Sequence, residues 1–446
     1  MASAAEQLAA NMNIGAFQKA TELHKRIWFT LVALVIYRAG TYIPIPLINA
    51  AAFAHAFEGQ SKGILGMFNM FSGGAVQRMA IFSLNVMPYI SASIIVQLLQ
   101  TTYPPWEKLR KEGGEAGRKQ LNQYTRYLTV LLAVFQSFGI GVGLSNSPGI
   151  VDQPGLFFII STVVTLTGGT IFLMWLGEQM TSRGVGNGIS LIIFAGIVAR
   201  LPTALWQLLQ DARLDSSKTF EIFGLLILSV AIILAIVFME RAQRRLLIVY
   251  PKRQVGNRIM GGENSFLPLK INVSGVIPPI FASSLLLPAT AVSFAKPSSF
   301  PTWLQWVPFW AGQLTHGKPL YMALYGFLIV FFCFFYTSVV FNPDDTAENL
   351  RKYGGNLPGI RPGKRTAEYI DYVLTRLTLI GAVYIAIVCL VPEALAGPTG
   401  SYMFGGTSIL IVVSVTMDTV AQIQSHLLAH QYEGLIKKSK LRGVRR

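Results

Sequence analysis

The fold of this chain is decided by a short apolar stretch, Gly63-Ile64-Leu65-Gly66-Met67-Phe68-Asn69-Met70-Phe71-Ser72-Gly73-Gly74. A helix needs roughly 20 apolar residues to cross a bilayer, so this stretch is too short to span. The glycine pair at its end breaks the helix. Gln77 and Arg78 then interrupt the apolar run that follows.

A second apolar run, residues 79–99, is long enough to cross the membrane. The two runs together predict a re-entrant segment that sits on a glycine hinge and leads into a true span. Backbone without a complete helix is tolerated at membrane depth only where protein or a water-filled cavity surrounds it. Broken segments of this kind are typical of the working sites of channels and transporters.

The composition indicates one polytopic membrane domain rather than several soluble ones. Apolar residues make up 52% of the 446 residues, charged residues make up 13%, and the mean hydropathy is +0.48. Soluble proteins average about 25% charged residues. We expect no cleavable signal peptide, because residues 1–21 lack a compact apolar core. We expect no disulfide framework, because Cys333 and Cys389 both lie in apolar runs.

Hydropathy predicts about ten membrane spans. The candidate spans are residues 23–43, 79–99, 127–144, 156–176, 189–205, 220–239, 271–289, 320–340, 373–391 and 409–427.

The positive charge behind the net charge of +16 is concentrated in every second loop, on one side of the membrane, which argues against a nucleic-acid partner. Of the 37 Lys and Arg residues, 28 lie in the N-terminal segment, the tail and loops 104–126, 177–187, 240–270 and 342–372. Only 7 lie in the loops between them. The positive-inside rule therefore places both termini and the long loops in the cytosol.

The predicted fold class is an all-α polytopic membrane protein with ten transmembrane helices in two halves of five. The halves are residues 1–205 and 206–446, with the boundary in the polar stretch between the fifth and sixth spans. Inverted repeats usually contain an odd number of spans each, so five plus five fits that architecture. No clear self-similarity between the halves is visible in the sequence.

Two cytosolic loops are unusually long, residues 240–270 and 342–372. Loops of this length in compact proteins are usually functional. The second contains Pro358-Gly359-Ile360-Arg361-Pro362-Gly363, which predicts a rigid turn that presents one positive charge. The alternative is that these loops reflect only the positive-inside bias and that Arg361 is a solvated side chain.

The second and seventh spans both contain proline beside small residues. Pro88 precedes Ser91, and Pro278 and Pro279 precede Ser283. Proline kinks a membrane helix and small residues allow close packing. The pattern predicts either a separable seam with nearby polar groups, Gln97 and Asn272, or ordinary packing of kinked helices.

Asp418 is the clearest acid inside a predicted span. An acid at membrane depth is a candidate functional group. We prefer pairing with Arg38, Arg376 or a helix end, because no second acid or histidine lies near the middle of a span. The sequence shows no metal-ligand spacing and no nucleophile with a base, so we expect no metal, cofactor or enzymatic activity.

Several motifs together resemble the SecY family, the channel-forming subunits of the Sec protein translocon, over essentially the whole chain. The motifs are residues 67–75, 87–94, 177–179, 186–190, 341–343, 358–363 and 405–408. The resemblance implies two pseudo-symmetric halves around an hourglass-shaped central pore. Unfolded secretory polypeptides would cross the cytoplasmic membrane through it, and membrane proteins would leave it sideways into lipid.

The resemblance also implies the roles of particular residues. It implies an apolar constriction ring formed by Val86, Ile90, Ile189, Ile193, Ile280 and Ile411. Val86 departs from the Ile expected in bacterial relatives, so the ring is expected to be looser there. The re-entrant segment would be the plug, formed by Ile64, Leu65, Met67, Phe68, Asn69, Met70, Phe71, Ser72, Gly73 and Gly74.

A lateral gate would lie between the second and seventh spans, with Ile94, Gln97, Asn272 and Ile277 on its facing sides. The motor ATPase SecA and the ribosome would dock on Arg361 and on Arg244, Arg245, Lys252, Arg253 and Arg258. SecE and SecG would be the small partner subunits, and signal peptides, nascent chains and lipid would contact the channel.

Two other functions remain open from the sequence. A secondary transporter of small solutes would also use broken helices, but it calls for paired intramembrane charges, and only Asp418 is available. A membrane-embedded enzyme would need a catalytic constellation, which the sequence lacks.

Overall fold

The computed structural model describes residues 21–58, 69–145, 149–214, 216–250, 253–255, 258–260, 264–293, 313, 318–399 and 405–443. Helices predominate among them. Ten helices occupy the ten predicted spans: α3 (Thr21–Gly40), α6 (Met87–Thr102), α8 (Gly114–Ser145), α9 (Leu156–Arg183), α10 (Gly188–Leu214), α11 (Ser216–Arg241), α12 (Ile277–Ser293), α14 (Pro319–Val340), α16 (Lys364–Thr399) and α17 (Gly406–Gly443).

Six of the helical segments in the described residues are long and apolar enough to cross a membrane by length and composition alone. They lie in α8, α9, α10, α14, α16 and α17. Three short helices, α4 (Ala50–Glu58), α7 (Pro104–Glu112) and α15 (Pro343–Lys352), connect the longer ones.

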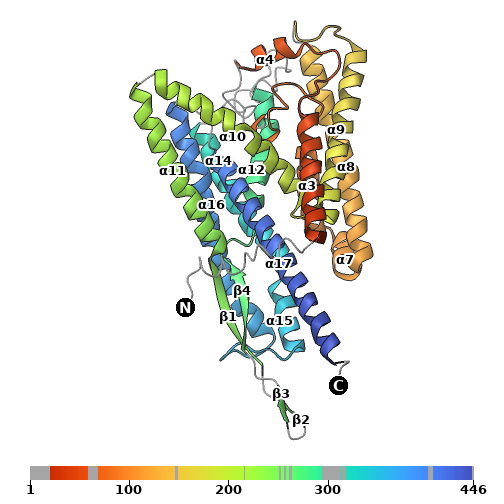
Figure 1. Ribbon diagram of the computed structural model, residues 1–446, viewed down its shortest axis with the longest axis vertical. Helices are drawn as coiled ribbons and strands as arrows, with labels where there is room; N and C mark the ends of the chain where they lie inside the picture. Colours follow the sequence, from red (N-terminus) through yellow and green to blue (C-terminus); the bar gives the residue numbers. More distant parts are fainter. Residues whose placement is uncertain are drawn as a thin grey trace.

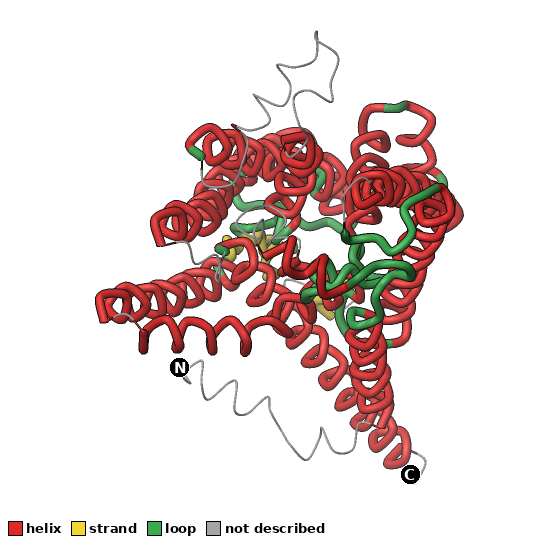
Figure 2. The backbone as a smooth tube through the Cα atoms, turned by 90° about the horizontal axis from the view of Figure 1, so that it is seen from above, coloured by secondary structure: helices red, strands yellow, loops and turns green. Residues whose placement is uncertain are grey.

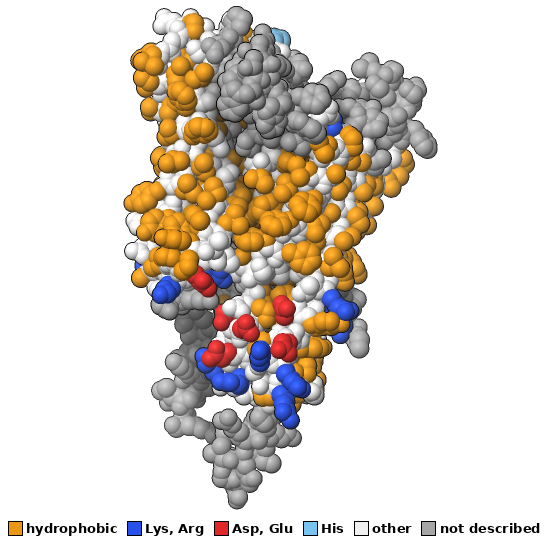
Figure 3. All heavy atoms as spheres, turned by 180° about the vertical axis from the view of Figure 1, so that it is seen from behind, with side chains coloured by type: hydrophobic (Ala, Val, Ile, Leu, Met, Phe, Trp, Pro, Cys, Tyr) orange, Lys and Arg blue, Asp and Glu red, His pale blue; other side chains and the backbone are white. Residues whose placement is uncertain are grey.

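The helices stand side by side, with α4 at one end of the molecule and the strands at the other (Figure 1). Seen along the long axis, the helices surround a central region that turns and loops cross (Figure 2). On the face shown in Figure 3, hydrophobic side chains form a broad band and charged side chains gather near one end. This distribution fits a chain whose middle lies in lipid.

The second and seventh spans begin later than predicted. Residues 79–86 form turns and α6 begins at Met87, while α12 begins at Ile277. Pro88 therefore lies in the first turn of α6, where a missing N–H costs no hydrogen bond. Pro278 and Pro279 likewise lie in the first turn of α12. The prediction that these prolines kink the spans was wrong: they start the helices.

The long loop 240–270 is a β-ribbon, which the sequence did not predict. Strand β1 (Gln243–Val249) pairs antiparallel with β4 (Asn264–Lys270), and β2 (Arg253–Val255) pairs with β3 (Arg258–Met260). Leu246 and Leu269 form a small apolar cluster with Leu357 and Ile370, which belong to the other long loop and to α16. The two predicted basic loops therefore form one structure.

The predicted boundary at residue 205 falls inside a helix. α10 continues without a break to Leu214, although Pro202 lies within it, and α11 begins at Ser216. The division into halves at 205 stays a prediction.

Close backbone packing between α9 and the turns of residues 79–86 provides a test of the fold. A Cβ built on Gly169 would lie 2.2 Å from the Ile81 carbonyl oxygen, whereas a Cβ on the adjacent Gly168 would meet nothing within 4 Å. We expect Gly169→Ala to destabilise the protein by about 1–3 kcal/mol, because α9 must move away from the turn. Gly168→Ala should be neutral or stabilising by up to about 1 kcal/mol. Thermal unfolding in detergent measures both, and equal effects would contradict the packing.

Candidate functional site

The predicted re-entrant segment is described from Asn69 onward. Ile64, Leu65, Met67 and Phe68 lie outside the described residues. Residues 69–71 are helical, residues 72–79 form turns, and most of this segment is buried. Gly73 and Gly74 have φ angles of 65° and 89°, a region that favours glycine, so the glycine pair forms a turn as predicted.

Side chains within the segment satisfy its backbone. The Asn69 side-chain oxygen accepts from the backbone N–H of Gln77 at 2.9 Å, and the Asn69 amide donates to the Gln77 side chain at 3.3 Å. The Asn85 amide donates to the Phe71 carbonyl at 2.8 Å in a buried position. The turn is therefore closed by two asparagines, which sequence reasoning had not assigned to this role.

Arg38 of α3 fixes the glycine turn from outside. Its guanidinium donates to the Gly73 carbonyl at 2.6 Å and to the Tyr42 hydroxyl at 2.8 Å. The Arg78 guanidinium lies over the ring of the same Tyr42, 4.0 Å from its centroid. A Cβ on Gly196 would lie 2.2 Å from the Phe71 carbonyl, so α10 packs directly on the segment.

These contacts correct the expectation for Asp418. Arg38 bonds to the turn, and Arg376 lies over the Tyr372 ring at 4.2 Å. Within the described residues, no ion pair joins Asp418 to either arginine, and its side chain is exposed. The preferred pairing of Asp418 with these two residues was therefore wrong.

All six predicted ring residues belong to one hydrophobic cluster. Val86, Ile90, Ile193 and Ile411 are buried in it, and Ile189 and Ile280 are partly buried against it. They come from the starts of α6, α10 and α12 and from the first two turns of α17. The fold thus brings together aliphatic side chains from four helices; their role as a ring stays a prediction.

A tight turn between α9 and α10 places the two ring residues of α10. The Thr181 hydroxyl donates to the Gly177 carbonyl and accepts from the Gly188 N–H, both at 2.9 Å. A Cβ on Gly188 would lie 2.0 Å from the Gly177 carbonyl oxygen, so the close approach requires glycine. The glycine-rich motif is therefore a helix connection, and Ile189 follows it directly.

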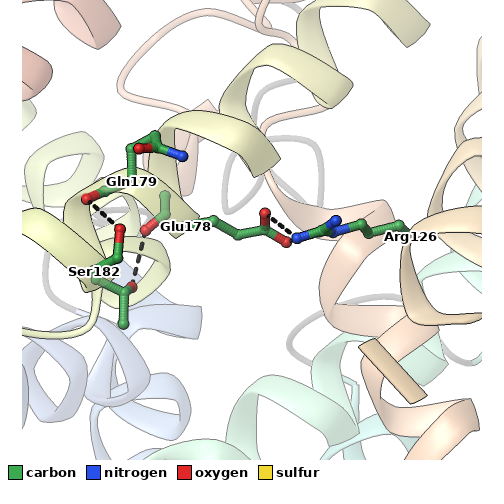
Figure 4. A network of polar contacts seen from close by, with 6 residues as sticks. Arg126, Glu178, Gln179 and Ser182 are labelled. Atoms are coloured by element: carbon green, nitrogen blue, oxygen red, sulfur yellow. Dashed lines mark hydrogen bonds and ion pairs between the residues drawn. The ribbon is translucent and has the colours of Figure 1, made fainter. Parts of the chain in front are cut away.

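An ion pair supports this turn from α8. Arg126 binds Glu178 of α9 with two parallel hydrogen bonds, Nε to Oε1 at 2.9 Å and Nη2 to Oε2 at 2.7 Å (Figure 4). Bidentate pairs of this geometry are the strong ones. The side chains of Arg126 and Glu178 are 46% and 28% exposed, so solvent weakens the attraction between their charges. The sequence motif containing Glu178 had given no indication of this partner.

The helices of the predicted gate are in contact, since α6 packs against α12. Ile94 and Ile277 both lie against the main cluster. The two polar groups bond to other residues: Gln97 donates to Ser93 at 3.3 Å, and Asn272 donates to Glu240 of α11 at 2.7 Å.

β1, β2 and β3, which carry four of the predicted docking residues, lie at one end of the molecule (Figure 1). Arg361 is exposed in the turn before α16, and Arg244 and Arg245 are exposed on β1. Arg253 and Arg258 belong to β2 and β3, and Lys252 lies outside the described residues. On α15, a hydrogen bond from Lys352 and its charge lower the pKa of Glu348. Lys352 is therefore paired with an acid, whereas Arg244, Arg245 and Arg361 are exposed.

No cluster of three or more His, Cys, Asp or Glu side chains that could hold a metal occurs in the described part of the chain.

Comparison with known proteins identifies the family. The SecY family model matches residues 80–420. The chain belongs to the SecY family. Protein translocase subunit SecY of Rickettsia bellii is 51% identical over 431 residues, covering 95% of this chain and 98% of that protein. The protein of the same name from Escherichia coli K12 is 50% identical over 430 residues, covering 95% and 96%.

Solved structures of protein-conducting channels have a similar fold. A structure described as that of a protein conducting channel superposes with a TM-score of 0.66 at 16% identity, covering 92% of this chain and 93% of that one. Sec61 in a canine ribosome-channel complex gives 0.62 at 16% identity, with the same coverage. The predicted fold class, a helical polytopic membrane protein with ten spans, is confirmed.

The hydrogen bond from Asn85 to the Phe71 carbonyl generates a prediction. Asn85→Gly leaves this buried carbonyl without its donor, a loss of about 1–3 kcal/mol, and glycine tolerates the φ of 49° at this position. We expect amide hydrogen exchange in residues 69–86 to become roughly tenfold faster or more, because the turn opens more often. Asn349→Gly, at an exposed position of α15, is the control and should leave exchange in residues 69–86 unchanged. Unchanged exchange in folded Asn85→Gly protein would show that the bond does not hold the turn.

Proposed function

We propose that this chain is the protein-conducting channel of a Sec translocase. It moves unfolded secretory polypeptides across the cytoplasmic membrane and releases membrane proteins sideways into the bilayer. The observation that carries the proposal is the 50% identity to the E. coli translocase subunit over 95% of the chain. The cluster of aliphatic residues beside a buried, hinged turn segment supports it.

The aliphatic cluster suits a pore for chains of any sequence. Such a pore has no specific ligand to bind, so it needs a constriction that excludes ions by dewetting and that adapts to the passing chain. Val86, Ile90, Ile189, Ile193, Ile280 and Ile411 would supply it, with Val86 as its smallest member.

The turn segment suits a plug. It is joined to α6 through the buried turn that ends at Val86, and the glycine pair allows it to swing as a lid. In the resting state residues 64–75 would close the channel on the non-cytosolic side of the ring. The α6–α12 contact would be the lateral gate, parting to admit apolar helices to lipid.

Docking partners would bind at the end that carries the strands. SecA would offer carboxylates or carbonyls and the ribosome would offer RNA phosphates to Arg361 and to the basic ribbon around Arg244 and Arg245. Sec61 occurs in a ribosome-channel complex. SecE and SecG are the proposed small subunits. The protein would reside in the cytoplasmic membrane with both termini in the cytosol, as the distribution of Lys and Arg favours.

Reconstitution tests the function. Vesicles that contain this chain with SecE and SecG should protect a secretory preprotein from added protease when SecA and ATP are present, and they should not take up small solutes. Omission of ATP is the control. Solute uptake without preprotein protection would instead favour a secondary transporter.

Arg361 provides a sharper test of docking. It lies in a turn between Pro358 and Pro362, where Thr366 donates to its carbonyl at 3.0 Å, so its side chain starts from a fixed place. A planar guanidinium fork binds carboxylate or phosphate in a way that an ammonium does not. We expect Arg361→Lys and Arg361→Glu both to lower SecA-driven transport at least tenfold. Arg351→Lys, at an exposed position of α15, is the control. Normal transport with Arg361→Lys would show that Arg361 contributes only its positive charge on the cytosolic side and has no specific docking role.

A further inference from the structure

One hydrogen bond joins α7, in the first half of the sequence, to the cytosolic end of α14, in the second half. The Arg110 guanidinium of α7 donates through Nη2 to the Val339 carbonyl of α14 at 2.7 Å. The two residues are 229 positions apart in the sequence.

The Val339 carbonyl needs an outside donor because of the sequence that follows it. In an α-helix this carbonyl would accept from the N–H of the residue four positions on, which is Pro343 and has no N–H. The helix instead ends with the Phe341 N–H bonded to the Thr337 carbonyl. Val339 is only 9% exposed, so its carbonyl lies where an unpaired acceptor is costly.

The charge of Arg110 also fits the end of α14. The carbonyls at a helix C-terminus carry partial negative charge, which a cation stabilises. In the described part of α14, the last turn contains no basic residue of its own. Arg110 therefore supplies both the missing donor and the missing positive charge.

The bond crosses the seam that we propose as the lateral gate. On one side, α6 leads through Tyr103 directly into α7, which carries Arg110. On the other side, α12 packs against α14, and α6 packs against α12. The two sides of the seam cannot separate at their cytosolic ends while Arg110 holds the Val339 carbonyl.

We propose that Arg110 is a positioning residue that latches the lateral gate shut at its cytosolic end. This inference rests on the proposed gate. When the seam parts, the hydrogen bond between the guanidinium and the carbonyl breaks, and water must solvate both groups. The latch therefore adds to the free energy of the closed state, and anything that draws Arg110 away from α14 favours opening.

Spin-label distances across the seam test the latch without any transport assay. Labels on cysteines at the exposed positions Ile95 of α6 and Leu285 of α12, in a background of Cys333→Ser and Cys389→Ser, report the separation in lipid nanodiscs. We expect R110A to lower the ratio of closed to open populations about tenfold, as for loss of a hydrogen bond to a charged group. R110K should keep most of the closed population, because an ammonium can still donate to the carbonyl.

Lys108 gives the matched control, because it is exposed on the same short helix. K108A should give the distance distribution of the unaltered protein. If R110A lowers thermal stability but leaves the distances unchanged, Arg110 only caps α14 and the latch is wrong. If R110A does not fold, R110K and R110Q still decide: an open shift that grows as donor charge is lost supports the latch, and none overturns it.

A cysteine pair at Ile94 and Ile277 separates the latch from the gate itself. If oxidising this pair blocks preprotein transport and reduction restores it, the seam is the gate. Unchanged distances in R110A would then overturn the latch alone. If transport continues through a verified crosslink, the gate is wrong, and the distances still show whether Arg110 holds the two sides together.

Discussion

The structure depends on one constraint: backbone polar groups at membrane depth must find hydrogen-bond partners within the protein. A continuous helix meets this requirement by itself. The chain departs from continuous helix before α6, α10 and α12, where non-helical backbone leaves polar groups that need other partners. At each break, a polar side chain supplies the missing partner.

The partners differ but the arrangement is the same at each break. Asn85 and Arg38 bond the carbonyls of the turn segment, at Phe71 and Gly73. Before α10, the N–H of Val185 donates to Thr30 at 3.1 Å, and that of Gly186 donates to Gln422 at 2.8 Å. Before α12, the Asn272 amide donates to the Gly275 carbonyl at 3.2 Å and to Glu240.

Broken helices are also what brings the aliphatic cluster together. Val86, Ile189 and Ile280 lie at or within one turn of a helix start, so the non-helical segments before them end at the same cluster. A helix that ran the full width of the membrane would pass this cluster instead of starting at it. The non-helical segments, whose backbone needs extra hydrogen-bond partners, therefore allow the side chains of the proposed pore to converge.

The sequence predicted that the helix is interrupted near Gly73 and Gly74, but it did not predict where α6 begins. The glycine pair and the short apolar stretch were sufficient to predict the turn, since Gly73 and Gly74 both adopt positive φ angles. Residues 79–86 were assigned to a span because apolar composition does not distinguish a buried turn from a helix. Asn85, with φ of 49°, was the available signal, because asparagine tolerates this conformation better than other residues.

The residues that complete the broken backbone could not be found from the sequence. Arg38, Arg110 and Asn272 bond to main-chain atoms or to an acid far away in the chain, and a carbonyl leaves no mark in a sequence pattern. Pro343 shows that part of the information was present, since it removes the donor for Val339. Only the fold reveals that Arg110 replaces it.

The same constraint bears on what resists opening. Apolar side chains such as those of the proposed ring can slide past one another at little cost, because dispersion contacts are individually weak and have no strong direction. A hydrogen bond to a buried carbonyl is directional, and its loss leaves both groups to be solvated. Arg38 and Asn85 hold the turn segment, and Arg110 crosses the seam, through bonds of this second kind. In the proposed channel, a small number of polar contacts at the edges of the apolar cluster would therefore hold the closed arrangement, while the cluster itself would adapt to a passing chain.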